Sequence, residues 1–187
     1  MPLFANVIAC IIIVSTWSSI VSGQGDSPPC KATTQKSIFF SNSQHKDELH
    51  VSVEGQECNL AIVAISVIAP TGEVLYHYQG DFIDHMPFMI YAPELNKLVQ
   101  LFVNKVAEEA ANRLTSDLPA YTNTEDFYDA NNDFVIVPIP QYEALREEPR
   151  PLLWHATGNS SWQHVIYNRE LHASQVIMRG GIFHKTP

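Results

Sequence analysis

Basic residues are scarce in this sequence. Of its 187 residues, 11 are lysine or arginine and 20 are aspartate or glutamate, so the formal net charge is −9 with neutral histidines. Proteins that bind nucleic acid or anionic membrane surfaces need clusters of lysine and arginine. We therefore expect neither of these partners, and the single "RGG" triplet at 179–181 does not indicate an RNA-binding segment. A cationic partner would fit the charge.

A long uninterrupted hydrophobic run is also missing, and no lysine or arginine precedes Lys31. An apolar stretch over 7–14 is followed by small and polar residues that end in Val21-Ser22-Gly23. This pattern predicts a cleaved secretory signal peptide over 1–23 and export to the periplasm or the cell exterior. One alternative is an uncleaved anchor, although a spanning helix needs about 20 mostly apolar residues. Another is a lipoprotein, although most of the apolar run follows Cys10 of the "VIAC" segment. After cleavage we expect no stable membrane span.

Cysteine is rare, with three residues in the whole chain. Signal cleavage would remove Cys10 and leave Cys30 and Cys58, which we predict to form a disulfide in the oxidising exterior. The alternative is two free buried thiols. A metal pair is disfavoured because neither cysteine has a Cys or His neighbour at ligand spacing.

Internal repeats and long low-complexity tracts are absent too, and the remaining pattern predicts one domain. We expect a polar N-terminal lead-in over 24–36 and a single α+β domain over 37–187. Residues 49–54 alternate between apolar and polar, as in a half-buried strand. Residues 60–69 are almost all apolar, which predicts a central strand covered on both faces, and a turn at 70–73 leads to a strand over 74–79.

The second half of the chain predicts one long helix followed by short strands. Over 92–114, apolar residues recur at helical spacing (Leu95, Leu98, Phe102, Val106, Ala110 and Leu114), and Glu109 stands four residues before Arg113. We expect 124–134 to be an acidic loop, 135–140 to be a short edge strand and 141–149 to form one or two helical turns. Three apolar segments (152–154, 164–167 and 174–179) predict a β-meander. The predicted fold is α+β, a mainly antiparallel sheet packed on one long amphipathic helix with a C-terminal β-meander.

No complete catalytic motif is present. The segment "LLWHATGNSSWQH" over 152–164 contains serines beside a glycine, but it lacks the second glycine of the G-x-S-x-G nucleophile turn and the helix that follows it. We interpret it as a hairpin whose flanking side chains form a binding rim, with Trp154, His155, Trp162 and His164 as the candidate binding residues. Asn159-Ser160-Ser161 matches the N-glycosylation pattern, which has meaning only in a eukaryotic secretory pathway.

The eight histidines form no recognised metal motif, and no cofactor signature occurs. The best local group lies in "HYQGDFIDH", where His77, Asp81, Asp84 and His85 are weak candidates for a catalytic or metal-binding cluster. The acidic segment 124–134 lacks the alternation and the glycine of an EF-hand Ca²⁺ loop.

These absences favour a non-enzymatic exported binding module for a protein or an envelope polymer. An inhibitor of a cationic enzyme is one version, and Trp154 and Trp162 would be its anchors. The alternative is a hydrolase or metal-dependent enzyme in which the His/Asp cluster converges. A third hypothesis is a structural envelope component without a small-molecule site.

Overall fold

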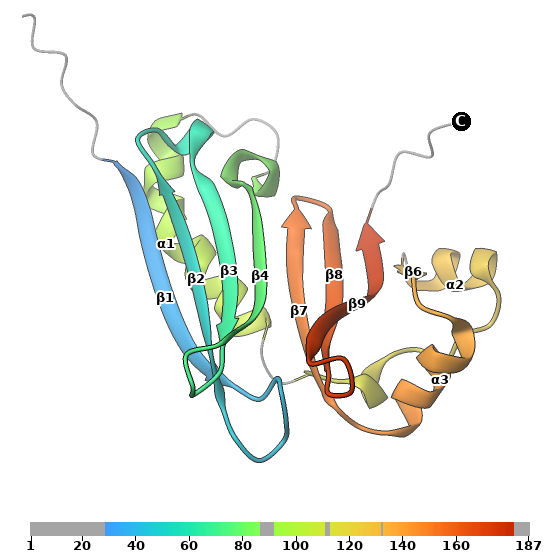
Figure 1. The fold of residues 1–187 in the computed structure, drawn as a ribbon. Coiled ribbons are helices and arrows are strands. Elements are labelled where there is room, and N and C mark those ends of the chain that lie inside the picture. The colour runs from blue at the N-terminus through green and yellow to red at the C-terminus, as the bar shows by residue number, and fades with distance from the viewer. Residues whose placement is uncertain (1–28, 87–91, 111–112, 132, 182–187) are drawn as a thin grey trace, which may run out of the picture.

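The computed structural model describes residues 29–86, 92–110, 113–131 and 133–181, so the predicted signal peptide lies outside the described residues. These residues form two antiparallel sheets that stand side by side, with helices around them (Figure 1). The predicted α+β class and the C-terminal meander are confirmed. Within the described ranges, no helix has both the length and the hydropathy to cross a membrane.

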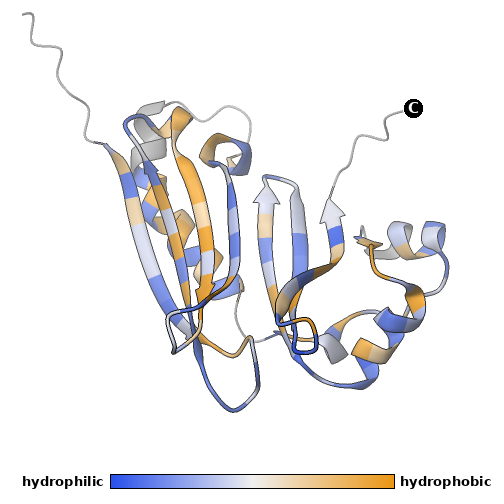
Figure 2. Cartoon of the chain, viewed as in Figure 1, coloured by the Kyte–Doolittle hydropathy of each residue, from blue (hydrophilic) through white to orange (hydrophobic). Residues whose placement is uncertain are grey.

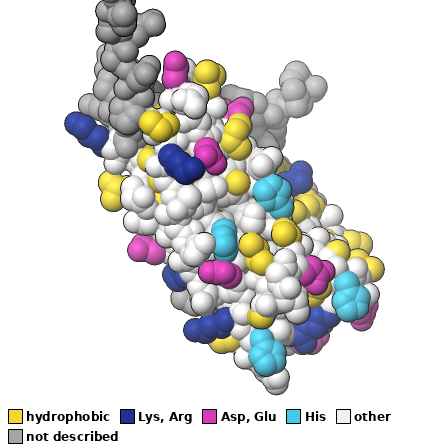
Figure 3. All heavy atoms as spheres, turned by 60° about the vertical axis from the view of Figure 1, so that its left-hand side comes forward, with side chains coloured by type: hydrophobic (Ala, Val, Ile, Leu, Met, Phe, Trp, Pro, Cys, Tyr) yellow, Lys and Arg dark blue, Asp and Glu magenta, His cyan; other side chains and the backbone are white. Residues whose placement is uncertain are grey.

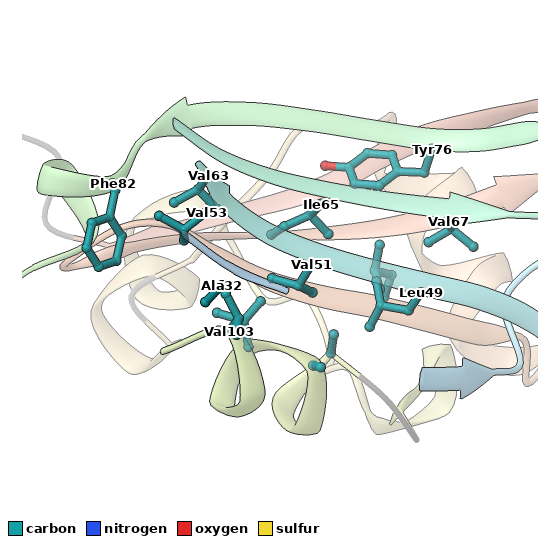
Figure 4. Packing of buried hydrophobic residues seen from close by; sticks show 14 of the residues in the cluster. Ala32, Leu49, Val51, Val53, Val63, Ile65, Val67, Tyr76, Phe82 and Val103 are labelled. Atoms are coloured by element: carbon teal, nitrogen blue, oxygen red, sulfur yellow. The ribbon is translucent and has the colours of Figure 1, made fainter. Parts of the chain in front are cut away.

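The N-terminal sheet has four strands in the order β1-β2-β3-β4. They are β1 Cys30–Ile38, β2 Asp47–Gly55, β3 Ile62–Ile68 and β4 Val74–Asp81. The helix α1 Ala92–Glu109 packs on the inner face of this sheet, against β1 and β2. Aliphatic side chains of the strands and the helix fill the space between them, as Figure 4 shows for Val51 and Val53 of β2 and for Val103 of α1. The predicted disulfide between Cys30 and Cys58 is confirmed and ties β1 to the short 3₁₀ segment Cys58–Leu60.

Two sequence predictions for the strands of this half need correction. The polar lead-in over 24–36 is wrong from residue 30 onward, because β1 alternates buried and exposed residues and pairs along its whole length with β2. The strand β3 is almost entirely hydrophobic (Figure 2), yet only one of its faces is buried, and Ile62 remains 40% exposed. The hydrophobic composition of a strand therefore does not by itself indicate how many of its faces are buried.

The long helix is shorter than predicted. It ends at Glu109, and residues Arg113–Leu114 form the strand β5, which pairs with residues 151–152. Arg113 pairs with Leu152 and is therefore not part of the helix, so the expected Glu109–Arg113 pair does not form. Instead, Lys105 Nζ lies 3.7 Å from Glu109 Oε1. The predicted stripe is confirmed in part, because Val106 and Ala110 are buried and Phe102 packs against the core. Val99, Val103 and Ala107 complete the buried face of the helix.

The C-terminal sheet has five strands in the order β5-β7-β8-β9-β6. Its further strands are β6 Asp133–Val135, β7 Pro151–Gly158, β8 Ser161–Asn168 and β9 Ala173–Gly181. The predicted acidic loop over 124–134 is wrong, since Thr124–Asn131 is the helix α2, with Glu125 and Asp126 in its first turn, where acidic side chains stabilise a helix. The helix α3 Ile139–Glu147 agrees with the predicted helical turns, and β6 lies at the edge of the sheet. The predicted edge strand over 135–140 is wrong beyond Val135, because β6 ends there and residues 139–140 begin α3.

The two sheets share one hydrophobic cluster, and the C-terminal sheet has a second cluster of its own. Leu153 of β7 and Val165 of β8 belong to the cluster of the N-terminal sheet and α1. On the opposite face of the C-terminal sheet, residues from α2, α3 and the strands form the second cluster, with Phe127, Tyr142 and Ile166 among its most buried members. The C-terminal sheet is therefore packed on both faces.

Candidate functional site

The predicted hairpin over 152–164 is present as β7 and β8, joined by the exposed residues Asn159 and Ser160. Its cross-strand register places Trp154 opposite His164 and Ala156 opposite Trp162. Because side chains alternate between the two faces of a strand, Trp154, Trp162 and His164 project from the same face. His155, the fourth candidate, pairs with Gln163 and projects from the other face.

The three side chains on the common face line one cleft of about 390 Å³, which we call the tryptophan cleft. Its walls come from five separate segments of the C-terminal half. The lining residues are Arg113, Asp117, Leu118, Pro119, Asp133, Leu152, Trp154, Trp162 and His164. The structure thus brings together three of the four predicted binding residues and adds charged residues from β5, β6 and the 3₁₀ turn Thr115–Asp117.

Trp162 is held in place by a buried carboxylate. Its indole Nε1–H donates a hydrogen bond of 2.8 Å to Asp133 Oδ1. Gly180 lies between β8 and β6, and a Cβ atom at this position would overlap both Asp133 Oδ1 and Trp162 Nε1. Burial raises the pKa of Asp133, and the hydrogen bond from Trp162 partly opposes that shift. The glycine therefore provides the space in which this pair forms.

Trp154 is covered on one side by a cation. The guanidinium carbon of Arg113 lies 4.9 Å from the centre of the Trp154 ring, a cation–π geometry. Nearby, Asp117 Oδ2 accepts a hydrogen bond of 2.8 Å from the backbone N–H of Leu114. The cleft therefore carries one guanidinium and two carboxyl groups around two indole rings, a combination of apolar surface with a few polar groups that is typical of small-molecule sites.

His164 lines the cleft but is only 7% exposed, and its Nδ1 atom has no hydrogen-bond partner among the described residues. Burial, with a smaller effect of the nearby Arg113 charge, lowers the pKa of His164 to about 4. The imidazole is neutral at pH 7 and can both donate and accept a hydrogen bond.

On the opposite face of the hairpin, His155 belongs to a buried network between the two sheets. Its side chain is fully buried, and its Nε2 lies 2.6 Å from the hydroxyl of Tyr76 on β4. Gln163 Nε2 donates to the same hydroxyl at 2.5 Å. The His155 Nδ1 atom lies 2.8 Å from the carbonyl oxygen of Ala156. His155 can therefore donate its Nδ1–H to Ala156 while its Nε2 accepts a hydrogen bond from the Tyr76 hydroxyl. This network joins the two sheets and is closed to a ligand in the cleft.

The weak catalytic candidates are divided between two sides of the N-terminal sheet. His77 and Asp81 project from its outer face, where His77 Nδ1 lies 2.8 Å from Ser66 Oγ. Asp81 and Asp84 line a groove on that face. His85 is only 7% exposed and packs edge-on against the rings of Tyr78 and Phe102 in the interior. Across the described ranges, no group of three or more His, Cys, Asp and Glu side chains is arranged to hold a metal ion.

Sequence reasoning missed Arg113, Asp117 and Asp133 as lining residues of the cleft. Arg113 was assigned to a helix and Asp133 to an acidic loop, and each reaches the cleft only because its strand joins the C-terminal sheet. The adjacent glycines Gly180 and Gly181 were a usable signal, because a glycine inside a strand often marks a close approach of other atoms.

Comparison of the chain with protein-family models, with curated proteins and with solved structures gives no match, so the tryptophan cleft is defined by its geometry and chemistry alone.

Proposed function

We propose that the chain is an exported, non-enzymatic binding module and that the tryptophan cleft binds one sugar unit of an envelope or extracellular polysaccharide. The observation that carries this proposal is the convergence of Trp154 and Trp162 with Asp117, Asp133 and Arg113 in a single cleft of about 390 Å³. Ligand clefts commonly have volumes of about 300–1,000 Å³.

A sugar ring fits the chemistry of this cleft better than a cationic protein segment does. Its C–H groups can pack on an indole face, while its hydroxyl groups can both donate and accept hydrogen bonds. Carboxylates accept these bonds, a guanidinium donates them and a neutral imidazole does both. Arg113 would repel an approaching lysine or arginine, whereas a neutral polyol pays no such cost.

One observation supports a second candidate function. Burial raises the pKa of Asp133. This residue shares the cleft with another carboxyl group, that of Asp117. Glycoside hydrolysis uses two carboxyl groups that flank the scissile bond, one of them as the acid. The second candidate is therefore a glycoside hydrolase at the same cleft, with Asp133 as the acid.

Binding can be measured through the tryptophans themselves. The full chain has three tryptophans, and both the chain processed after Gly23 and a full-length Trp17→Phe chain retain only Trp154 and Trp162. We expect titration with soluble fragments of peptidoglycan, chitin or cellulose to change its fluorescence for one of the three glycans, and the insoluble form of that glycan to sediment the protein. Trp154→Ala should weaken binding by at least about tenfold, because truncating a central aromatic residue costs more than about 1.4 kcal/mol.

Phe39→Ala is the matched control. Phe39 is 44% exposed, and Lys46 Nζ lies 5.6 Å from its ring centre, so it reproduces the aromatic–cation pair of the cleft at a different site. The control should bind as the unmodified chain does. Equal binding by Trp154→Ala and Phe39→Ala, or no binding to any of the three glycans, would overturn the proposal.

A reducing-sugar assay on the glycan that binds separates the two candidates. A binding module leaves the glycan intact. Release of reducing ends that Asp133→Asn abolishes, with binding retained, would replace the binding module by the hydrolase.

A further inference from the structure

The outer face of the N-terminal sheet contains a second concave surface, and its lining residues differ in chemistry from those of the tryptophan cleft. This groove has a volume of about 610 Å³, and we call it the acidic groove. It is lined by Ser52, Glu54, Ile62, Ala64, Gln79, Gly80, Asp81 and Asp84. Figure 3, which brings the side of the N-terminal sheet forward, shows acidic side chains interspersed with hydrophobic, basic and histidine side chains.

The strand register explains how the groove is built. Glu54, Ile62 and Asp81 form one row across β2, β3 and β4, and Ser52, Ala64 and Gln79 form the next row. Neighbouring strands lie about 4.8 Å apart, so the backbones of Glu54 and Asp81 are about 10 Å apart, on either side of Ile62. The groove therefore has an apolar floor on β3 and acidic walls on both sides.

The acidic walls are only partly neutralised. Glu54 Oε1 accepts a hydrogen bond of 2.9 Å from Lys31 Nζ, and both of these side chains are more than half exposed. Asp81 and Asp84 have no hydrogen-bonding or ion-pairing side chain in the part of the chain that the structure describes. Three carboxylates and one ammonium group thus face an apolar strip that includes Ile62, which is 40% exposed.

We propose that the acidic groove docks a segment of a partner protein in which one apolar side chain stands between two basic ones. The apolar residue would lie on Ile62 and Ala64, and the basic residues would pair with Asp81 or Asp84 on one side and with Glu54 on the other. A second copy of this chain fits poorly, because each copy carries a net charge of −9 and the two would repel. Steering by the acidic surface would also speed the encounter with a basic partner.

This docking surface is independent of the sugar-binding proposal. The acidic groove is on the outer face of the N-terminal sheet, and the tryptophan cleft is built from the C-terminal sheet. Variants in one site should leave binding at the other site unchanged, so the two proposals can fail separately.

The test uses a capped synthetic peptide, Lys-Ser-Leu-Ser-Lys, in which the leucine and both lysines point to one side of an extended chain. Titrated to millimolar concentration into the ¹⁵N-labelled full chain, it should shift the amide signals of Ile62, Ala64 and Gln79. The double variant Asp81→Asn/Asp84→Asn should weaken binding about twofold, because it removes the ion pair on one side of the groove and an exposed ion pair contributes about 0.5 kcal/mol. Raising the salt concentration should weaken binding as well.

Controls separate docking at the groove from general attraction to an acidic protein. The variant Glu125→Gln/Glu170→Gln makes the same charge change at exposed positions elsewhere and should bind the peptide normally. The peptide Lys-Ser-Gly-Ser-Lys keeps both charges and should bind more weakly, because it lacks the apolar side chain. Shifts that avoid the groove, equal loss in both double variants, equal binding of both peptides, or no binding would each overturn the proposal.

Discussion

The two sheets of this protein differ in how many of their faces are covered. The N-terminal sheet buries one face against α1 and the C-terminal sheet and leaves the other face to solvent. The C-terminal sheet buries both faces. The helices α2 and α3 and their connecting segments cover its second face, but this cover does not extend to one end of the sheet. Both candidate sites occupy uncovered sheet surface: the acidic groove on the open face of the first sheet, and the tryptophan cleft where the cover of the second sheet ends.

The join between the sheets is polar as well as hydrophobic. Tyr76, His155 and Gln163 form a hydrogen-bonded group within a mostly apolar contact, and Ser174 Oγ donates to the carbonyl oxygen of Leu75 at 2.5 Å. Buried polar groups must be paired with suitable geometry, so this network specifies how β4 meets β7 and β8 more tightly than hydrophobic packing alone.

The largest effect that we predict is a loss of stability in acid. Burial lowers the pKa of His85, His155 and His164 to about 4 in the folded chain, compared with an ordinary value of 6.5. Between these two values the unfolded chain binds more protons than the folded chain does, so the free energy of unfolding falls as the pH drops from about 6.5 to about 4. For one isolated histidine such a shift corresponds to about 3 kcal/mol.

Urea denaturation at a series of pH values measures this loss. His85→Leu should make the pH dependence shallower, because the His85 ring has no hydrogen-bond partner among the described residues and lies in an apolar contact. The exposed His45→Gln control should keep the original dependence. Identical pH profiles for the two variants would show that His85 does not contribute.

The next largest effect concerns the disulfide, which only the N-terminal sheet has among the described residues. Cys30→Ser/Cys58→Ser removes a cross-link over a sequence separation of 28 residues, and chain entropy predicts a loss of about 3.5 kcal/mol. Hydrogen exchange should accelerate most in β1 and β2. An equal acceleration in β7 and β8 would show that the two sheets unfold as one cooperative unit.

The smallest effect that we predict is the loss of stability on substituting one glycine, and it should differ between the two sheets. Gly180→Ala should cost about 1–3 kcal/mol, because the new methyl group overlaps the Trp162–Asp133 pair inside a packed site. In the N-terminal sheet, a Cβ atom at Gly80 meets only the end of the Tyr78 side chain, so Gly80→Ala should cost less. Thermal unfolding measures both losses, and tryptophan fluorescence should change only in Gly180→Ala. A larger loss in Gly80→Ala would contradict this comparison.

Local patterns in the sequence predicted a large part of the fold. The alternation around Leu49 and Val51, the hairpin of β3 and β4, the amphipathic helix and the C-terminal meander all have signals within a few residues. The segments that were predicted wrongly depend on distant partners. Residues 30–36 are polar, yet they form a strand because β2 provides a full row of hydrogen-bonding partners.

The candidate site was predictable to a similar degree. Turn residues and alternation were enough to place Trp154 and His164 on one hairpin. In the structure, their side chains also project from the same face of the sheet. His155 was grouped with them by proximity in sequence, although it projects to the opposite side and bonds to Tyr76. Asp133 could not be assigned, because its carboxylate meets Trp162 only across the intervening strand β9.

By itself, the sequence determined the acidity of this protein and indicated the Cys30–Cys58 pair, the strands around residues 49–79, the long helix and the C-terminal meander. These follow from composition, cysteine count and short-range periodicity. Only the tertiary structure decided which sheet face stays open, which histidines are buried and which charged residues line the cleft. These properties depend on contacts between segments far apart in the chain, and short-range periodicity does not encode them.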